Sequence, residues 1–444
     1  MDKKVEFFQT DRINLLFAWA CQVGRLLLNY FYMNFKVLKG NFRSFDIRGL
    51  SPQEIDDTTA YAVAKAFVRY NPTQLVVIGY DHRASTQALR AGLIKGFTDA
   101  GVNVWDLGQC TTDTLYFASW FYAKLGVEGA VMITASHMPA QFNGLKFVTK
   151  SLQPIGQGMG MEELYELAST ITTAEVVARP GKVESKNVSA DYLKFLWSFV
   201  DVQQIKPLRV AMDCGNGVAG KTARQVFAPF KLRATELCFT PDSSFPNHEA
   251  NPIEEKNRLH IMQEVSKGGY DLGIAWDADA DRCYFIDELG QFVHGDFITA
   301  LLAKVFLQNK PNAHIVYDLR ASEVVKNTVE KMGGVAHMQK VGHSHIKKMM
   351  REQQAVFGGE VSGHYYFAAN QYMDNGFIPA LLVLSLISQS GKTLSQLIKE
   401  LGEYYVSGEI NSTVVDREAV IARLQTQYKD ARQFTLDGVS VEYD

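Results

Sequence analysis

The chain has 444 residues, of which 47% are hydrophobic and 21% charged, and its formal net charge is −3. A chain of this length is too long for one ordinary hydrophobic core, so we expect several domains. Its charge gives no bulk attraction for nucleic acid or for an anionic membrane, and no nucleic-acid partner is expected. Any anionic ligand must therefore be held by local cations.

Residues 1–33 are interpreted as an N-terminal appendage. The stretch 13–33 is strongly apolar, but Gln22, Gly24 and Arg25 interrupt it before it reaches the roughly 20 continuous apolar residues that a membrane span needs. We favour an appendage or a misassigned start, with Met33 as the alternative beginning, over an amphipathic helix or a membrane anchor. No stable membrane insertion is expected.

The five cysteines are scattered along the chain and form no CxxC pair. This pattern argues against a disulfide framework or a zinc site. It favours a reducing cytoplasm as the location.

Three short β-branched runs each end at an aspartate. They are "LVVIGYDHR" up to Asp81, "LRVAMDCGNG" up to Asp213 and "AHIVYDLRAS" up to Asp318. Helical patterns follow the first two, and strands that alternate with helices predict parallel sheets covered on both faces. The recurrence of this pattern predicts three related α/β domains.

The stretch "VMITASHMPAQFNGLKF" carries a first candidate site. An apolar run delivers Ser136 and His137 to a loop, and Lys146 follows. A serine needs an activating neighbour to act as a nucleophile or phosphate carrier, and the histidine and lysine offer a proton path and positive charge. An ordinary polar turn explains the same residues about equally well.

A second candidate site is "GIAWDADADRCYF". Asp277, Asp279 and Asp281 alternate with alanines behind an apolar strand, so their carboxylates can turn to one side. Hard oxygen donors at this spacing suit Mg²⁺, and Arg282 offers a fork for a phosphate oxygen. A magnesium-dependent aspartyl-phosphate hydrolase and a solvated acidic turn are the alternatives.

Two further motifs are less specific. In "KVGHSHIKKMM", His343 is suited to proton transfer near neutral pH, although an exposed basic helix start fits as well. In "FGGEVSGHYYF", Glu360 and Ser362 lie between glycines and can hydrogen-bond vicinal sugar hydroxyls, although a tight structural turn is the alternative.

Taken in order, "FDIRG", "TASHMPAQFNGLKF", "DADADR", "DLRAS", "VGHSHIK" and "GEVSGH" resemble the α-D-phosphohexomutase superfamily, and within it the bacterial phosphomannomutase/phosphoglucomutase group. The resemblance implies an α/β fold of three related mixed-sheet domains plus an incomplete fourth α+β domain around a central cleft. The expected boundaries are 34–186 for the phosphoserine domain, 187–291 for the metal-binding domain, 292–403 for the sugar-binding domain and 404–444 for the partial phosphate-binding domain.

The resemblance also implies roles for individual residues. Ser136 would carry the phosphoryl group and, with Asp277, Asp279 and Asp281, hold Mg²⁺. The remaining implied site residues are Arg48 near the phosphoserine, Lys146 and His343 in proton transfer, and Arg282, Arg320, Glu360, Ser362 and His137 in substrate binding. Two positions depart from the usual family motifs, since Phe45 replaces a tyrosine and Met138 an asparagine.

The implied reaction interconverts the 6-phosphate and 1-phosphate of mannose, glucose or both, through a phosphoserine and a hexose 1,6-bisphosphate that also acts as activator. We expect a cytoplasmic monomer or weak dimer that makes nucleotide-sugar precursors. A phosphoglucosamine mutase is less favoured, because Val361 stands where that group usually has glutamine. Family members carry an "RxSNTEP"-like phosphate loop in the fourth domain, and this sequence stops at "GVSVEYD" before such a loop. A fragment or inactive family member, and a catalytically dead binding protein, are therefore further alternatives.

Overall fold

The structure is a computed structural model that describes residues 35–171, 176–408, 410 and 412–443. The stretch interpreted as an appendage, 1–33, lies outside these residues. Within the described ranges, no helix is long and apolar enough to cross a membrane.

The first unit is built on a six-stranded sheet with the strand order β1-β5-β4-β2-β3-β6. Strand β2 is parallel to β3 and β4, while β5 is antiparallel to β4 and β1. The strands are β1 (Ile47–Leu50), β2 (Leu75–Tyr80), β3 (Asn103–Gln109), β4 (Ala130–Ile133), β5 (Phe142–Val148) and β6 (Val183–Ser185). The helices are α2 (Asp57–Tyr70), α3 (Thr86–Asp99), α4 (Thr112–Phe121) and α5 (Met161–Ser169).

The second unit has a five-stranded sheet with the order β11-β10-β9-β7-β8. Here β7 is parallel to β8 and β9, and β10 is antiparallel to β9 and β11. The elements are α6 (Ser189–Trp197), β7 (Arg209–Asp213), α7 (Ala219–Phe227), β8 (Arg233–Leu237), α8 (Glu255–Ser266), β9 (Leu272–Trp276), β10 (Cys283–Ile286) and β11 (Phe292–Val293).

The third unit repeats this plan with the order β13-β12-β14-β15-β16. Strand β12 is parallel to β13 and β14, and β15 is antiparallel to β14 and β16. The strands are β12 (His314–Asp318), β13 (Val335–Gln339), β14 (Phe357–Gly359), β15 (Tyr365–Phe367) and β16 (Met373–Asp374). The helices are α9 (Gly295–Asn309), α10 (Val324–Lys331), α11 (His343–Glu352), α12 (Phe377–Ser390) and α13 (Leu394–Lys399).

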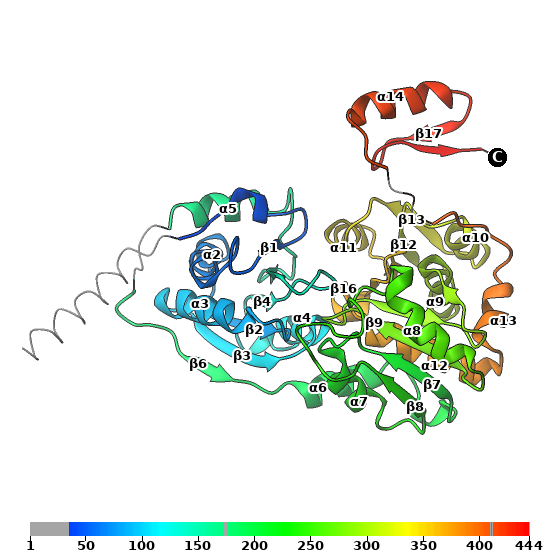
Figure 1. The fold of residues 1–444 in the computed structure, drawn as a ribbon, viewed down its shortest axis with the longest axis horizontal. Helices are drawn as coiled ribbons and strands as arrows, with labels where there is room; N and C mark the ends of the chain where they lie inside the picture. The colour runs from blue at the N-terminus through cyan, green and yellow to red at the C-terminus, as the bar shows by residue number, and fades with distance from the viewer. Residues whose placement is uncertain (1–34, 172–175, 409, 411, 444) are drawn as a thin grey trace, which may run out of the picture.

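The last described segment is small. It consists of α14 (Arg417–Gln427) and a hairpin of β17 (Arg432–Phe434) and β18 (Ser440–Glu442). Figure 1 shows α14 and β17 set apart from the three larger units. No residue of α14 is buried, so the helix takes little part in any core.

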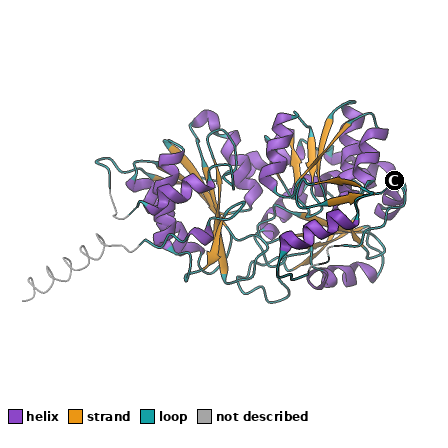
Figure 2. Cartoon of the chain, turned by 90° about the horizontal axis from the view of Figure 1, so that it is seen from above, coloured by secondary structure: helices purple, strands orange, loops and turns teal. Residues whose placement is uncertain are grey.

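The three β-branched runs identified in the sequence form β2, β7 and β12, which occupy the same place in their sheets. The helices expected after the first two runs are α3 and α7. Neighbouring residues of each run point to opposite faces of the sheet and enter different hydrophobic clusters. Examples are Val76 and Val77 of β2, and Val210 and Ala211 of β7. Each sheet is therefore covered on both faces, as predicted, and Figure 2 shows helices around the strands.

The aspartates that end these runs make the same turn. A side-chain oxygen of Asp81, Asp213 and Asp318 accepts a hydrogen bond from the backbone N–H two residues later, at 2.8 to 3.1 Å. The turn forms because the short aspartate side chain can accept a hydrogen bond from a backbone N–H that has no partner in the sheet once the strand has ended.

The shared plan places three loops at equivalent positions, each between the third parallel strand and the antiparallel strand beside it. These loops join β4 to β5, β9 to β10, and β14 to β15. They contain Ser136, the three clustered aspartates, and the segment Glu360–His364 respectively. Three of the motifs selected from the sequence therefore lie at one topological position of a repeated fold.

Candidate active site

Ser136 lies in the loop after β4 and is 2% exposed, with its backbone in the left-handed region at φ 49°. Arg83 holds this loop, because its guanidinium donates to the carbonyl oxygens of Ser136 at 2.6 Å and Met138 at 2.7 Å. It also donates to the carbonyls of Pro139 and of Phe142, the first residue of β5. Arg83 is itself buried and paired with Asp81 at 3.0 Å. The carbonyl bonds fix a serine conformation that would otherwise be costly.

The acidic loop of the second unit meets the serine directly. The Ser136 hydroxyl donates a hydrogen bond to Oδ2 of Asp277 at 2.8 Å. Asp277, Asp279 and Asp281 are all buried, and their ligand oxygens converge within 4.8 Å of one another. The predicted meeting of two motifs some 140 residues apart along the chain is present in the structure.

One buried cation balances part of this charge. Lys146 of β5 donates from Nζ to Oδ2 of Asp279 at 2.8 Å and to Oδ2 of Asp281 at 2.5 Å. Burial by itself would lower the pKa of Lys146, but the two carboxylates raise it well above its usual value. For Asp279 the two effects are reversed. Burial by itself would raise the pKa of this carboxylate, but Lys146 lowers the pKa far below its usual range. Burial and the neighbouring carboxylates raise the pKa of Asp277 well above its usual value.

The acidic loop offers donors for a further cation. Oδ1 of Asp279 and Oδ1 of Asp281 are buried and have no hydrogen-bond partner among the residues that the structure describes. An unpaired buried carboxylate oxygen is costly, and a divalent cation with oxygen ligands would satisfy both atoms. The residues present therefore fit a hard metal ion of the kind predicted from their spacing.

A cavity of about 260 Å³ opens beside Ser136. Its lining brings together residues from all three larger units, including the predicted site residues Arg48, Ser136, His137, Lys146, Arg282 and His343. The volume lies just below the usual range of small-molecule sites, and five of these six side chains carry or can carry positive charge. Such a lining suits a phosphorylated ligand.

Two of the three histidines that line the cavity, His137 and His343, have pKa values well below the usual value. Burial, followed by the charge of Lys347, lowers the pKa of His343 well below its usual value. Burial and Arg282 do the same for His137, whose Nδ1 lies 3.1 Å from the Ser136 hydroxyl. Nδ1 of His343 is buried and has no hydrogen-bond partner within the described part of the chain, so it is available to a ligand.

Three predicted residues do not line this cavity. Glu360 is 1% exposed, and its two oxygens accept hydrogen bonds from the backbone N–H of Gly342, at 3.0 Å, and from the hydroxyl of Tyr366. Ser362 is buried beside it, and Arg320 pairs with Asp318 at 3.0 Å. In this conformation the three side chains have internal partners or are covered.

Sequence reasoning assigned no role to several other residues of the site. His364 lines the cavity and accepts a hydrogen bond from Arg282. Thr112, at the start of α4, donates to Oδ2 of Asp279 at 2.6 Å. Lys347 of α11 is fully buried and paired with Asp374 at 2.7 Å. His364 and Lys347 stood in motifs selected from the sequence, but the alternatives of a structural turn and of an exposed basic helix start left both without a role.

Three family models match most of the chain, and all describe phosphoglucomutase/phosphomannomutase. Alpha/beta/alpha domain I matches residues 39–175, domain II residues 190–290 and domain III residues 294–405.

Curated relatives and a crystal structure agree with these matches. A phosphomannomutase of Escherichia coli K12 is 36% identical over 411 residues, which cover 90% of each chain. A protein of Xanthomonas campestris described as "phosphohexose mutases" is 36% identical over 407 residues, again 90% of each chain. The crystal structure of a phosphoglucomutase/phosphomannomutase family protein from Burkholderia thailandensis is 28% identical, with a TM-score of 0.81, and covers 92% of this chain and 89% of its own.

The fold and the site define a multidomain α/β phosphotransferase in which a buried serine meets an acidic loop. The chain belongs to the phosphoglucomutase/phosphomannomutase family, within the α-D-phosphohexomutase superfamily. The predictions of this family, of its multidomain α/β fold and of a hexose phosphate mutase are thereby confirmed.

Proposed function

We propose that the enzyme interconverts the 6-phosphate and the 1-phosphate of mannose, glucose or both, with Ser136 as the phosphoryl carrier. The observation that carries this proposal is the 2.8 Å hydrogen bond from the Ser136 hydroxyl to Asp277. It places the serine oxygen against the acidic loop, where a phosphoryl group on that oxygen would lie beside the carboxylates and Lys146.

In the proposed reaction, the phosphoryl group on Ser136 passes to the free hydroxyl of a hexose phosphate. The P–O bond to the serine breaks as the bond to the sugar oxygen forms, which gives a hexose 1,6-bisphosphate. The sugar then turns over, and its other phosphoryl group returns to Ser136. Free bisphosphate would rephosphorylate a bare serine, which accounts for the expected activation by this compound.

Protein side chains supply proton transfer and charge. His343 is neutral and has a free Nδ1, so it can take the proton of the attacking hydroxyl. Lys146 is held as a cation between Asp279 and Asp281, and it stabilises charge on the transferring oxygens and can return a proton. Arg48 and Arg282 line the cavity and offer forked donors to phosphate.

Asp277, Asp279 and Asp281, together with the phosphoryl group on Ser136, would hold Mg²⁺. When bound, the ion neutralises charge on the transferring phosphoryl group, which is the main requirement of phosphoryl transfer. The two unpartnered carboxylate oxygens support this assignment. An aspartyl-phosphate hydrolase is less well supported, because Asp277 already accepts the serine hydroxyl.

The remaining predictions extend this proposal. We assign sugar contacts to Glu360, Ser362 and Arg320, and since none lines the described cavity, these loops would have to rearrange on binding. We also propose domains at 34–186, 187–291, 292–403 and 404–444, a cytoplasmic location, and a monomer or weak dimer.

Steady-state rates with mannose 1-phosphate, glucose 1-phosphate and glucosamine 1-phosphate test the substrate class. We expect turnover of the first two at rates that exceed that of the amino sugar, and loss of all turnover in Ser136→Ala. A clear preference for glucosamine 1-phosphate would overturn the assignment of the sugar. Undiminished turnover in Ser136→Ala would overturn the assignment of the carrier.

A further inference from the structure

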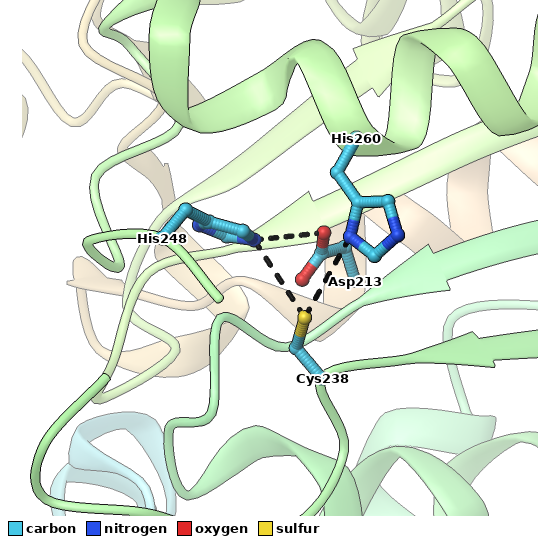
Figure 3. Close-up of side chains that lie close together, drawn as sticks. All are labelled: Asp213, Cys238, His248 and His260. Atoms are coloured by element: carbon cyan, nitrogen blue, oxygen red, sulfur yellow. Dashed lines mark hydrogen bonds and ion pairs between the residues drawn. The ribbon is translucent and has the colours of Figure 1, made fainter. Parts of the chain in front are cut away.

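A second cluster of ligand-type side chains lies in the second unit. It is formed by Asp213, Cys238, His248 and His260, whose ligand atoms all lie within 4.8 Å of one another. Figure 3 shows the four side chains pointing toward a common centre. They come from the end of β7, the turn after β8, the following loop and helix α8. None of them belongs to the Ser136 cavity.

Three of the separations between these ligand atoms come close to those of a tetrahedral metal site. Zinc bonds of about 2.0–2.1 Å to nitrogen or oxygen and about 2.3 Å to sulfur place neighbouring ligand atoms about 3.3–3.6 Å apart. Sγ of Cys238 lies 3.8 Å from Nε2 of His248 and 3.9 Å from Nδ1 of His260. Nε2 of His248 lies 3.1 Å from Oδ2 of Asp213. A small change in each of these three separations would bring them to the tetrahedral values, and the remaining pairs of ligand atoms lie within 4.8 Å of one another.

The outer contacts of the cluster orient its ligands. Nδ1 of His248 donates to the carbonyl oxygen of Glu249 at 2.9 Å, so Nε2 is the ring nitrogen that faces Asp213 and Cys238. Oδ1 of Asp213 accepts from the backbone N–H of Gly215 at 2.8 Å, so Oδ2 is the oxygen that faces His248. The backbone of Cys238 has a φ of 52°, which is uncommon for a residue other than glycine. Its side chain points toward the centre of the cluster.

We infer that Asp213, Cys238, His248 and His260 bind a Zn²⁺ ion. One thiolate, two imidazoles and one carboxylate form a ligand set that suits zinc rather than magnesium, and four protein ligands are typical of a structural site. The spacing of cysteines along the chain could not indicate this site, because Cys238 is its single cysteine. The expectation that scattered cysteines exclude zinc rested on spacing alone.

A metal ion bound at this site would hold in place a loop that contacts the first unit. Phe245 lies between Cys238 and His248 along the chain, and its ring is 5.4 Å from the guanidinium of Arg83. Arg83 in turn holds the Ser136 loop by four carbonyl contacts. A metal that ties His248 to β7 and α8 would thus hold Phe245 against Arg83.

Cobalt substitution tests the site without any need for turnover. The full chain, stripped with a chelator, is titrated with Co²⁺ and followed by absorption. We expect a single equivalent to give a near-ultraviolet sulfur-to-cobalt band and visible bands of tetrahedral cobalt. Co²⁺ at the acidic loop cannot give the sulfur band, since that loop offers only oxygens. The band should vanish in Cys238→Ser and persist in Cys110→Ser, a cysteine outside the cluster.

The inference is overturned if the unsubstituted chain shows no sulfur-to-cobalt band, or if Cys238→Ser retains it. A second variant, His260→Ala, separates loss of the site from misfolding. The side chain of His260 is exposed, so its removal should leave the fold intact. We expect Zn²⁺ to raise the melting temperature of the unsubstituted chain and of His337→Ala, a histidine outside the cluster. In His260→Ala, Zn²⁺ affinity should fall by more than the roughly 10–100-fold that loss of an outer partner of a ligand causes, because a direct ligand is removed. An equal zinc-induced rise in all three proteins would contradict the site.

Discussion

Nε of Arg282 donates a hydrogen bond to Nε2 of His364 at 2.9 Å, and the same two residues form an isolated β-bridge. Arg282 follows the acidic loop of the second unit, whereas His364 belongs to the equivalent loop of the third. Nδ1 of His364 lies 3.2 Å from Oδ2 of Asp374. The acidic loop is thus anchored on both sides, by Ser136 in the first unit and by His364 in the third.

Arg282→Lys should slow phosphoryl transfer to the sugar. An ammonium cannot reproduce the planar donor that meets His364, and it offers phosphate no fork. We expect kcat/KM to fall by about 10–100-fold, which corresponds to about 1.4–2.8 kcal/mol of lost transition-state stabilisation. Arg224→Lys is the matched control, because Arg224 is exposed and pairs with Glu236 at the surface. A change of less than twofold in Arg282→Lys would show that the link is not used.

Arg83→Ala should destabilise the first unit. The substitution leaves four loop carbonyls and the buried Asp81 without their partner. Breaking a buried, hydrogen-bonded ion pair costs about 3–5 kcal/mol, and we expect a fall in melting temperature of about 5–15 °C. Arg90→Ala removes a partly exposed arginine from its pair with Asp106 and should cost much less. Equal losses in the two variants would refute the structural role of Arg83.

Asp279→Asn should weaken phosphoryl transfer without preventing folding. The change keeps the shape of the side chain but removes the charge that Lys146 and a bound metal would share. Loss of a preorganised electrostatic contact at the reacting centre costs about 10²–10³-fold in rate, measured as the rate of serine phosphorylation by glucose 1,6-bisphosphate. Asp242→Asn, at an exposed position, should leave this rate unchanged. Intact transfer in Asp279→Asn would show that the acidic loop is not the metal site.

The neutral histidine His343 should make stability depend on pH. Its pKa is lowered by burial and by Lys347 in the folded chain, so below about pH 6.5 the unfolded chain binds a proton that the folded chain does not. Stability must therefore fall as the pH falls from about 6.5 toward the lower folded pKa. In His343→Gln this slope should shrink by up to about 1.4 kcal/mol per pH unit. Melting temperatures at pH 5.5 and 7.5 would show it; an identical pH slope in both proteins would contradict a neutral His343.

Strands with an unmistakable pattern were the most predictable part of the fold. The runs that end at Asp81, Asp213 and Asp318 form β2, β7 and β12, because continuous β-branched residues suit strands buried on both faces. The equivalent position of the three site loops could not be derived in the same way, since it depends on the antiparallel strands β5, β10 and β15. Short apolar strands such as β15 carry little periodicity of their own.

The site was predictable where its chemistry is concentrated in one motif. Ser136 and the three aspartates stand in compact runs. The resemblance to the family predicted that the serine and the aspartates lie together in one site. Thr112 and Asp374 reach the site from α4 and β16 as single polar residues, and nothing in the sequence around them signals a role. Glu360, by contrast, stands in a motif that is apparent in the sequence. Its oxygens nevertheless accept hydrogen bonds from Gly342 and Tyr366 in this conformation, and the sugar contact stays a proposal.

The identity of the phosphorylated residue tests the central claim most directly. The full chain is incubated with Mg²⁺ and glucose 1,6-bisphosphate, digested, and mapped by mass spectrometry under mild conditions. Our account predicts one acid-stable phosphoryl group on Ser136, which lies 2.8 Å from Asp277, and none in Ser136→Ala. An acid-labile phosphoryl group on Asp277 with Ser136 unmodified would contradict it.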